Sequence, residues 1–175
     1  MKPIIFLVPV IALLLVAILY WYLAKDATIN KKFRKFILAA GVVGFVLNLA
    51  WELIQMPLYN NGSFSINHVA FCALGAVADA IMVLLLYLVV ALFLRKALWI
   101  HQLTFLRAIT VVLTGGTLAI VSEMRHLSIG SWAYSKSMPI IYGVNVGISP
   151  VLQFMILPLL TYVISSKLHK ASNKE

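Results

Sequence analysis

Two acidic residues, Glu52 and Asp79, are the first candidates for chemistry, because each lies in a stretch that is otherwise apolar enough to cross a membrane. A carboxylate in hydrocarbon is costly, so such residues usually face a bundle interior, a partner or a watery cavity. General acid–base catalysis requires a carboxyl group whose pKa lies near the working pH. Burial without a nearby cation raises a carboxyl pKa toward that pH. We therefore interpret both as a catalytic acid and base that would protonate an alkene, epoxide or ester of a lipophilic substrate.

Other polar residues recur around these acids at helical spacing and form three stripes. In chain order the stripes are Asn48, Glu52 and Gln55, then His68, Cys72, Gly75 and Asp79, then Asn145, Ser149 and Gln153. Residues spaced by three, four or seven positions share one face of a helix. Three helices that each offer one polar stripe predict a shared internal pocket, in which Asn48, Asn145 and Gln153 position the substrate.

A third acid, Glu123, begins a polar and aromatic segment and is the third catalytic candidate. The other substrate-binding candidates outside the stripes are Arg125, His126, Trp132, Tyr134 and Tyr142. A structural interpretation exists for each type of residue: amides join helices, His68 caps a helix, Glu123 pairs with Arg125, and aromatic rings anchor the membrane interface.

The segment from Glu123 to Pro139, with Gly130-Ser-Trp132-Ala-Tyr134 before Met138-Pro139, resembles a helix-end pattern of membrane-embedded carotenoid-modifying proteins. These are the lycopene-cyclase and carotenoid-hydratase type, which use buried acidic residues to protonate polyene ends. The resemblance covers under a tenth of the chain and implies an isoprenoid-like substrate. It departs from the cyclases after the proline, where Ile140-Ile141-Tyr142 stand in place of acidic residues.

The composition predicts which elements hold these residues. Hydrophobic residues make up 63% of the 175-residue chain and charged residues 11%, against about 45–50% and about 25% in soluble domains. At about 20 residues per span, we expect one all-α domain, 1–175, built as a five-helix membrane bundle. The expected spans are about 3–24, 36–56, 68–94, 103–122 and 139–165. The first is expected to be a retained helix, because a long apolar run precedes its basic cluster.

Basic residues predict the orientation. Eleven of the fourteen Lys and Arg residues follow the first, third and fifth expected spans. The positive-inside rule then places the N-terminus outside and the C-terminus in the cytoplasm, and we expect a bacterial inner (plasma) membrane. The net charge of +9 is explained by these loops, so we expect membrane lipid and no nucleic acid as a partner. No metal or cofactor is expected, since the chain lacks a metal motif such as H-E-x-x-H.

Three functions remain open at this level. The first is an intramembrane enzyme that acts on a lipid or isoprenoid from an outward-facing pocket. The second is a component that binds or transports a lipophilic small molecule. The third is a non-catalytic subunit or assembly factor, whose acids would meet a partner membrane protein or a second copy of the chain.

Overall fold

The protein is described by a computed structural model that places residues 7–25, 27–60, 62 and 64–171. The described residues form five α-helices, which are α1 (Leu7–Leu23), α2 (Ala27–Gln55), α3 (Ile66–Leu94), α4 (Phe105–Ser128) and α5 (Ile148–Ala171). Helices α2 to α5 contain segments long and apolar enough to cross a membrane. The fold is therefore all-helical, and its four candidate spans indicate a multi-pass membrane protein.

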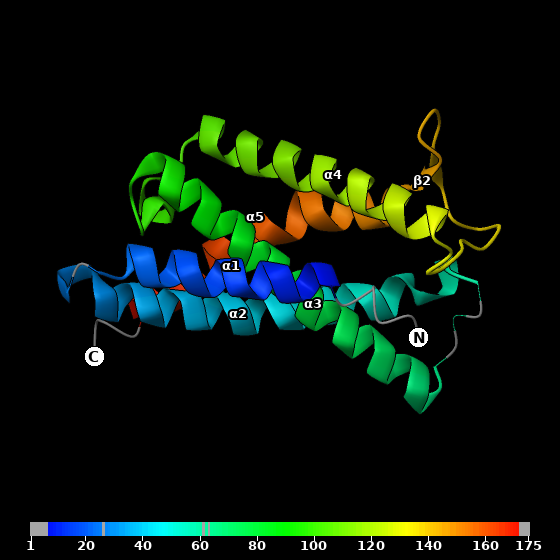
Figure 1. Cartoon of the computed structure of the whole chain (residues 1–175), viewed down its shortest axis with the longest axis horizontal. Helices are drawn as coiled ribbons and strands as arrows, with labels where there is room; N and C mark the ends of the chain where they lie inside the picture. The colour runs from blue at the N-terminus through cyan, green and yellow to red at the C-terminus, as the bar shows by residue number, and fades with distance from the viewer. Residues whose placement is uncertain (1–6, 26, 61, 63, 172–175) are drawn as a thin grey trace.

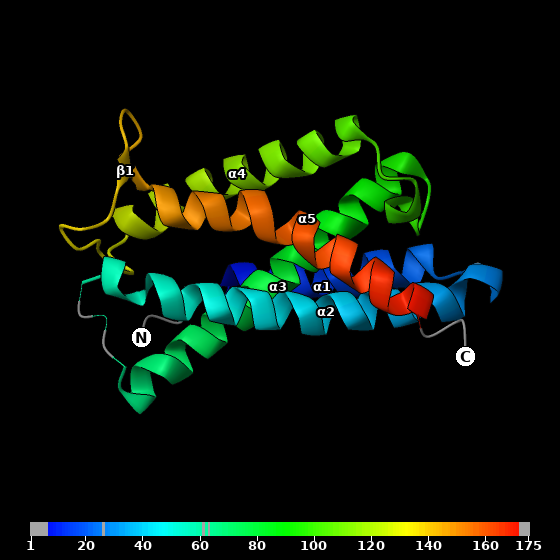
Figure 2. The same ribbon diagram turned by 180° about the vertical axis from the view of Figure 1, so that it is seen from behind.

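The helices are arranged as an open arc rather than a closed ring. Helix α1 packs on α3, α3 on α2, α2 on α5 and α5 on α4. This order makes α1 and α4 the two ends of the arc, and α3 and α4 both line its interior. Figures 1 and 2 show that they lie close where α3 ends and α4 begins, and diverge toward the other end of the bundle. The arc leaves an interior that residues from all five helices line without filling it.

Helix ends are set by local sequence. Helix α2 continues into a short 3₁₀ turn, η2 (Met56–Leu58), which contains Pro57, a residue that has no N–H for the helical ladder. The Ser65 side chain caps α3 by accepting a hydrogen bond from the His68 amide, and Thr104 caps α4 in the same way. A second 3₁₀ turn, η3 (Trp99–Gln102), lies between α3 and α4. Such hydroxyl caps satisfy amides that a helix start leaves unpaired.

The fifth expected span is wrong at its start. Residues 139–147 are not helical, because β1 (Ile140–Ile141) and β2 (Val146–Gly147) pair as an antiparallel hairpin. Gly143 and Asn145 adopt positive φ angles of 93° and 53° in its turn, a conformation that a helix excludes. Helix α5 begins only at Ile148. Asn145 is exposed and lies outside the helical stripe to which the spacing assigned it.

Other boundaries also differ from expectation. Helix α2 begins at Ala27 and not at about residue 36, and α5 ends at Ala171 and not at about residue 165. Helix α4 extends to Ser128, so the region around Glu123 is helical and not a loop. Helix α1 covers 17 residues, about 26 Å at 1.5 Å per residue, slightly short of an about 30 Å hydrocarbon core. The start expected for that span, residues 3–6, lies outside the described residues.

Glycine allows α4 and α5 to pack closely. A Cβ added to Gly115 would lie 2.0 Å from the Phe154 carbonyl oxygen, and one added to Gly116 would lie 2.9 Å from Met155 Cγ. The glycine pair thus admits the facing helix at close range. Close contact between small residues and a facing backbone is a usual way for membrane helices to associate.

Aromatic side chains close the end of the bundle opposite the hairpin. The Tyr87 ring stacks on Trp99 with centroids 5.1 Å apart, and Tyr162 meets both rings edge-on. The Tyr87 hydroxyl donates to the Ala97 carbonyl and the Tyr162 hydroxyl to the Val83 carbonyl. This fully buried cluster fixes one end of the arc and leaves the space between α3 and α4 at the other end.

Candidate functional site

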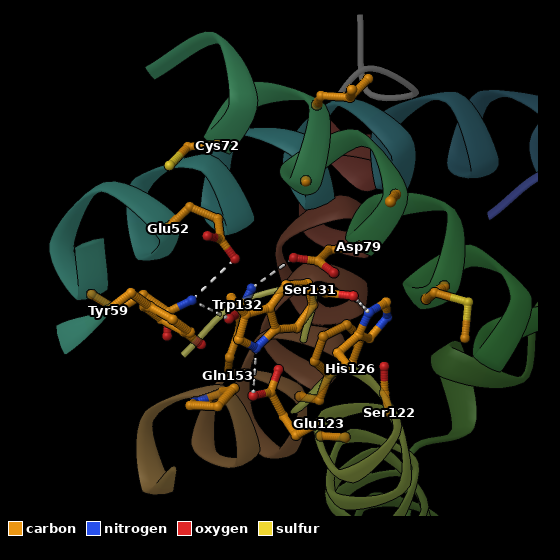
Figure 3. Close-up of a pocket in the computed structure, with 18 of the residues that line it drawn as sticks. Glu52, Tyr59, Cys72, Asp79, Ser122, Glu123, His126, Ser131, Trp132 and Gln153 are labelled. Carbon is orange, nitrogen blue, oxygen red and sulfur yellow. Dashed lines mark hydrogen bonds between the residues drawn. The ribbon is translucent and has the colours of Figure 1, made fainter. Parts of the chain in front are cut away.

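A cavity of about 680 Å³ occupies the open side of the arc. Helix α3 lines it from His68 to Leu86, and α4 from Gly115 to His126. Helices α2 and α5 contribute Glu52 and Gln153, respectively. Its volume lies within the about 300–1,000 Å³ that is usual for small-molecule sites. The helices thus leave room for a ligand beside the acidic residues (Figure 3).

An amide network at the back of the cavity joins α2, α3 and α5. Gln153 Nε2 donates to Asn48 Oδ1 at 2.9 Å and to Asp79 Oδ2 at 3.0 Å. Gln55 Nε2 donates to Gln153 Oε1 at 3.1 Å and to Glu52 Oε1 at 3.0 Å. Both amide nitrogens therefore use both of their N–H groups. Because one carboxyl oxygen of each acid accepts an amide N–H here, the acids fix which way each amide points.

The network continues along two helices. Ser149 Oγ donates to Gln55 Oε1 at 2.8 Å, and Asn48 Nδ2 donates to the Gly44 carbonyl at 2.8 Å. Asn48, Gln55 and Gln153 are buried, with at most 3% of their surface exposed. Buried polar side chains with satisfied partners fix one packing of the helices. The network thereby sets the position of Glu52 and Asp79.

Three of the five acidic residues of the chain meet at this cavity. Glu52, Asp79 and Glu123 all line it, and their charges interact with one another. Glu52 comes from α2, Asp79 from α3 and Glu123 from α4, so three helices converge here. Figure 3 shows Glu52 and Asp79 directed toward the same space, with Glu123 near the α4 side. None of the described residues that line the cavity is Lys or Arg.

Glu123 is held by two aromatic donors. Trp132 Nε1 donates to Glu123 Oε2 at 3.2 Å, and the Tyr134 hydroxyl donates to the same oxygen. The indole of Trp132 stacks on His126 with centroids 4.2 Å apart, and His126 Nδ1 pairs with Ser131 Oγ at 3.1 Å. The segment after α4 therefore folds back over the cavity and covers its polar end (Figure 3).

Backbone pairing joins this covering segment, residues 130–134, which we call the cover, to the end of α2. Tyr59 and Tyr134 form an antiparallel bridge, and the Asn60 amide donates to the Ala133 carbonyl at 2.9 Å. Burial raises the pKa of both tyrosines above the ordinary value, so both phenols stay protonated near neutral pH. Tyr134 is thus a constant hydrogen-bond donor to Glu123.

Most residues that the sequence singled out come together. Those that line the cavity are Glu52, Gln55, His68, Asp79, Glu123, His126, Trp132 and Gln153. Asn48 lies behind this lining and bonds to Gln153, and Tyr134 holds Glu123. Their roles in binding or catalysis remain predictions.

Three expected binding residues lie elsewhere. Tyr142 is 96% exposed at the hairpin turn, and Asn145 is exposed beside it. Arg125 faces away from the cavity lining, because it follows Glu123 by two positions and so points to another side of α4. The structure therefore does not place these three residues at the cavity, and their role in ligand binding stays a prediction.

The structure adds residues that the sequence did not indicate. Tyr59, Ser122 and Ser131 line the cavity. Tyr59 lies two positions after Pro57, and a tyrosine beside a span end is most simply an interfacial anchor. Its role in the cover depends on pairing with residues 75 positions away, which no local pattern shows. Among the described residues, no three His, Cys, Asp or Glu side chains are grouped to hold a metal ion.

No protein-family profile, curated protein or solved structure matches this chain. The class that the fold supports is a multi-pass helical membrane protein with an acidic cavity at one end of its bundle.

Proposed function

We propose that the protein is an intramembrane enzyme that acts on a lipid or isoprenoid substrate by carboxyl acid–base chemistry. The observation that carries this proposal is the meeting of Glu52, Asp79 and Glu123 at one cavity whose described lining has no Lys or Arg. Carboxylates that share such a site repel one another, and a bound proton relieves the repulsion. A proton held in this way is available for transfer to a substrate.

The hydrogen bonds support distinct roles for the three acids. One amide donor orients each member of the Glu52–Asp79 pair and contacts one of its oxygens. We assign the transferable proton to this pair. Glu123 Oε2 accepts from two donors, and these hydrogen bonds offset part of the cost of burying a charged carboxylate. Its charge would stabilise positive charge that develops on the substrate after protonation.

The proposed orientation puts the cavity on the outer side of a bacterial inner membrane. The described basic residues at 31, 32, 34, 35, 95, 96, 107 and 167 lie where α2 begins, α3 ends, α4 begins and α5 ends. These positions share one end of the bundle, opposite the hairpin (Figures 1 and 2). By the positive-inside rule this end faces the cytoplasm. The chain is then N-out and C-in, with α1 completing a five-span bundle.

Binding or transport of a lipophilic molecule is the second candidate, and the extent of the apolar lining favours it. Such a role would need the same cavity but no proton transfer. A non-catalytic subunit has less support, because tight packing around Glu52 and Asp79 would suit it better than a cavity of about 680 Å³.

Isotope transfer tests the enzyme proposal without a known substrate. The purified protein in lipid nanodiscs is incubated with a total lipid extract in water that carries deuterium and heavy oxygen. Protonation of an alkene leaves deuterium on carbon, and opening of an epoxide or ester incorporates heavy oxygen. We expect labelled lipid products with the native protein and at least a 100-fold loss with Glu52→Gln or Asp79→Asn.

Gln102→Glu is the matched control, because it makes the reverse exchange at an exposed position outside the cavity. It should leave labelling unchanged. The enzyme proposal fails if the native protein labels no lipid, or if the acid variants label as fast as the control.

A further inference from the structure

We infer that the ligand of this cavity is an amphiphile with one apolar chain and a neutral or cationic polar group, which enters from lipid between α3 and α4. The inference concerns the site of the proposed function and specifies its substrate class. It excludes lipids whose polar group is a phosphate, diphosphate or carboxylate.

Charge supplies the first argument. An anionic group that leaves water needs a cation or several donors to offset its lost hydration. The described lining presents three carboxyl groups, and its only basic side chains are His68 and His126. The His126 ring is already stacked on Trp132 and paired with Ser131. An anionic ligand would therefore meet like charge, whereas an alcohol or an ammonium would find acceptors.

The distribution of polarity supplies the second argument. Beyond Asp79, α3 lines the cavity with Ile81, Met82 and Leu86, which are all apolar. On α4 the lining deeper than Ser122 is Ala119, Leu118 and Gly115. The apolar part extends about 10 Å past Asp79, from seven residues at 1.5 Å each. A polar group beside the acids would thus leave this apolar stretch, about 10 Å long, for an attached chain.

Exposure of the lining supplies the third argument. Leu74 and Val77 of α3 are 43% and 44% exposed although they line the cavity, and Leu118 of α4 is 46% exposed. These side chains stand on the two helices that diverge in Figure 1. Within a membrane this opening faces acyl chains, because α3 and α4 are both candidate spans. An apolar chain can enter sideways there without crossing water.

A photolabelling competition tests the charge rule on the unaltered protein. The probe is dodecanol with a diazirine in its chain, added to the protein in phosphatidylcholine nanodiscs, with labelled peptides identified by mass spectrometry. Competitors are dodecanol, dodecylamine and dodecyl phosphate at equal membrane concentration. We expect labels on the cavity side of α3 and α4, with competition by the alcohol and the amine. Dodecyl phosphate should compete at least tenfold more weakly.

Two variants test the route and the charge separately. A Cβ at Gly75 would meet no atom within 4 Å, so Gly75→Phe can fill the cavity one turn before Asp79. It should reduce labelling at least fivefold, whereas the matched control Gly75→Ala should leave it unchanged. Ser122→Lys places a cation at an exposed lining position. It should improve competition by dodecyl phosphate at least fivefold and leave that of dodecanol unaltered.

The inference is overturned if dodecyl phosphate competes as well as dodecanol, or if labels appear only on the lipid-facing side of α2 around Leu38 and Val42. It is also overturned if the Gly75→Phe variant elutes like the native protein and is nevertheless photolabelled as strongly as Gly75→Ala. Charge-ranked competition without isotope transfer to any lipid would support the inference and refute the proposed reaction. Isotope transfer to lipid, together with equal competition by dodecyl phosphate and dodecanol, would refute the inference and support the proposed reaction.

Discussion

Replacing Gln153 with leucine should break the amide network and destabilise the helix bundle. Gln153 makes three hydrogen bonds, to Asn48, Gln55 and Asp79. At an average of about 0.6 kcal/mol for a hydrogen bond between membrane helices, they contribute roughly 2 kcal/mol. The change also leaves buried polar atoms of Asn48 and Gln55 unpaired, which costs about 1–3 kcal/mol each when nothing replaces the partner. With both contributions, we expect Gln153→Leu to lower the free energy of unfolding by about 4–8 kcal/mol.

Equilibrium unfolding in mixed dodecyl sulfate and mild detergent, followed by tryptophan fluorescence, measures this loss. Gln102→Leu is the matched control, since Gln102 is exposed and accepts one hydrogen bond, from Lys96. It should cost less than about 0.5 kcal/mol. An equal loss in the two variants would refute the argument that the network holds α2, α3 and α5 together.

Two further predictions concern the α4 side of the cavity. Gly115→Ala should lower the free energy of unfolding by about 1–3 kcal/mol in the same assay, because its Cβ would lie 2.0 Å from a backbone oxygen of α5. Gly75→Ala, which meets open space inside α3, should instead raise the free energy of unfolding by up to about 1 kcal/mol, because alanine favours a helix more than glycine does. Burial and then the hydrogen bond to Glu123 raise the pKa of Tyr134, so Glu123→Gln should lower that pKa while leaving it above the ordinary value. The raised pKa also means that stability conferred by Tyr134 is present below about pH 10 and lost as the pH rises toward its folded-state pKa. Ultraviolet titration of tyrosinate, with Tyr134→Phe to assign the signal, checks the shift, and an unchanged titration in Glu123→Gln would contradict the contact.

The sequence predicts the helical class and the stripe on α2 for physical reasons. Apolar runs longer than about 18 residues have few alternatives to a membrane helix, and the spacing of Asn48, Glu52 and Gln55 fixes one helix face. The observed contacts agree, since Glu52 and Asn48 both connect to Gln55 through one network. A buried acid was itself the signal that located the cavity.

The sequence could not show where the fifth helix begins. Residues 139–147 are mostly apolar, and periodicity alone does not separate a short apolar strand from a buried helix segment. Two left-handed residues, Gly143 and Asn145, decide the matter in favour of a hairpin. The second strand then packs closely on Met138 and Tyr134, since a Cβ added to Gly147 would lie 2.8 Å from Met138 Sδ and 3.1 Å from the Tyr134 ring. Asn145 was therefore assigned to a helix face that does not exist.

The cover over the cavity was equally beyond a local pattern. Trp132 and Tyr134 look like ordinary interfacial aromatics, and their bonds to Glu123 arise because α4 continues past that residue before the chain turns back. Tyr59 joins them only through a bridge between distant segments. Pairings of this kind depend on tertiary structure, and neither residue type nor spacing determines them.

Carbodiimide labelling tests most directly whether Glu52, Asp79 and Glu123 share one chamber. Lipophilic dicyclohexylcarbodiimide reacts with protonated carboxyl groups in apolar surroundings, and a bulky adduct on one acid would fill the space beside the others. We predict that each chain takes one adduct within this group, and that dodecanol slows the reaction. Intact-mass and peptide analysis would contradict the account if single chains carried adducts on two or three of these acids, or if the three reacted at independent rates.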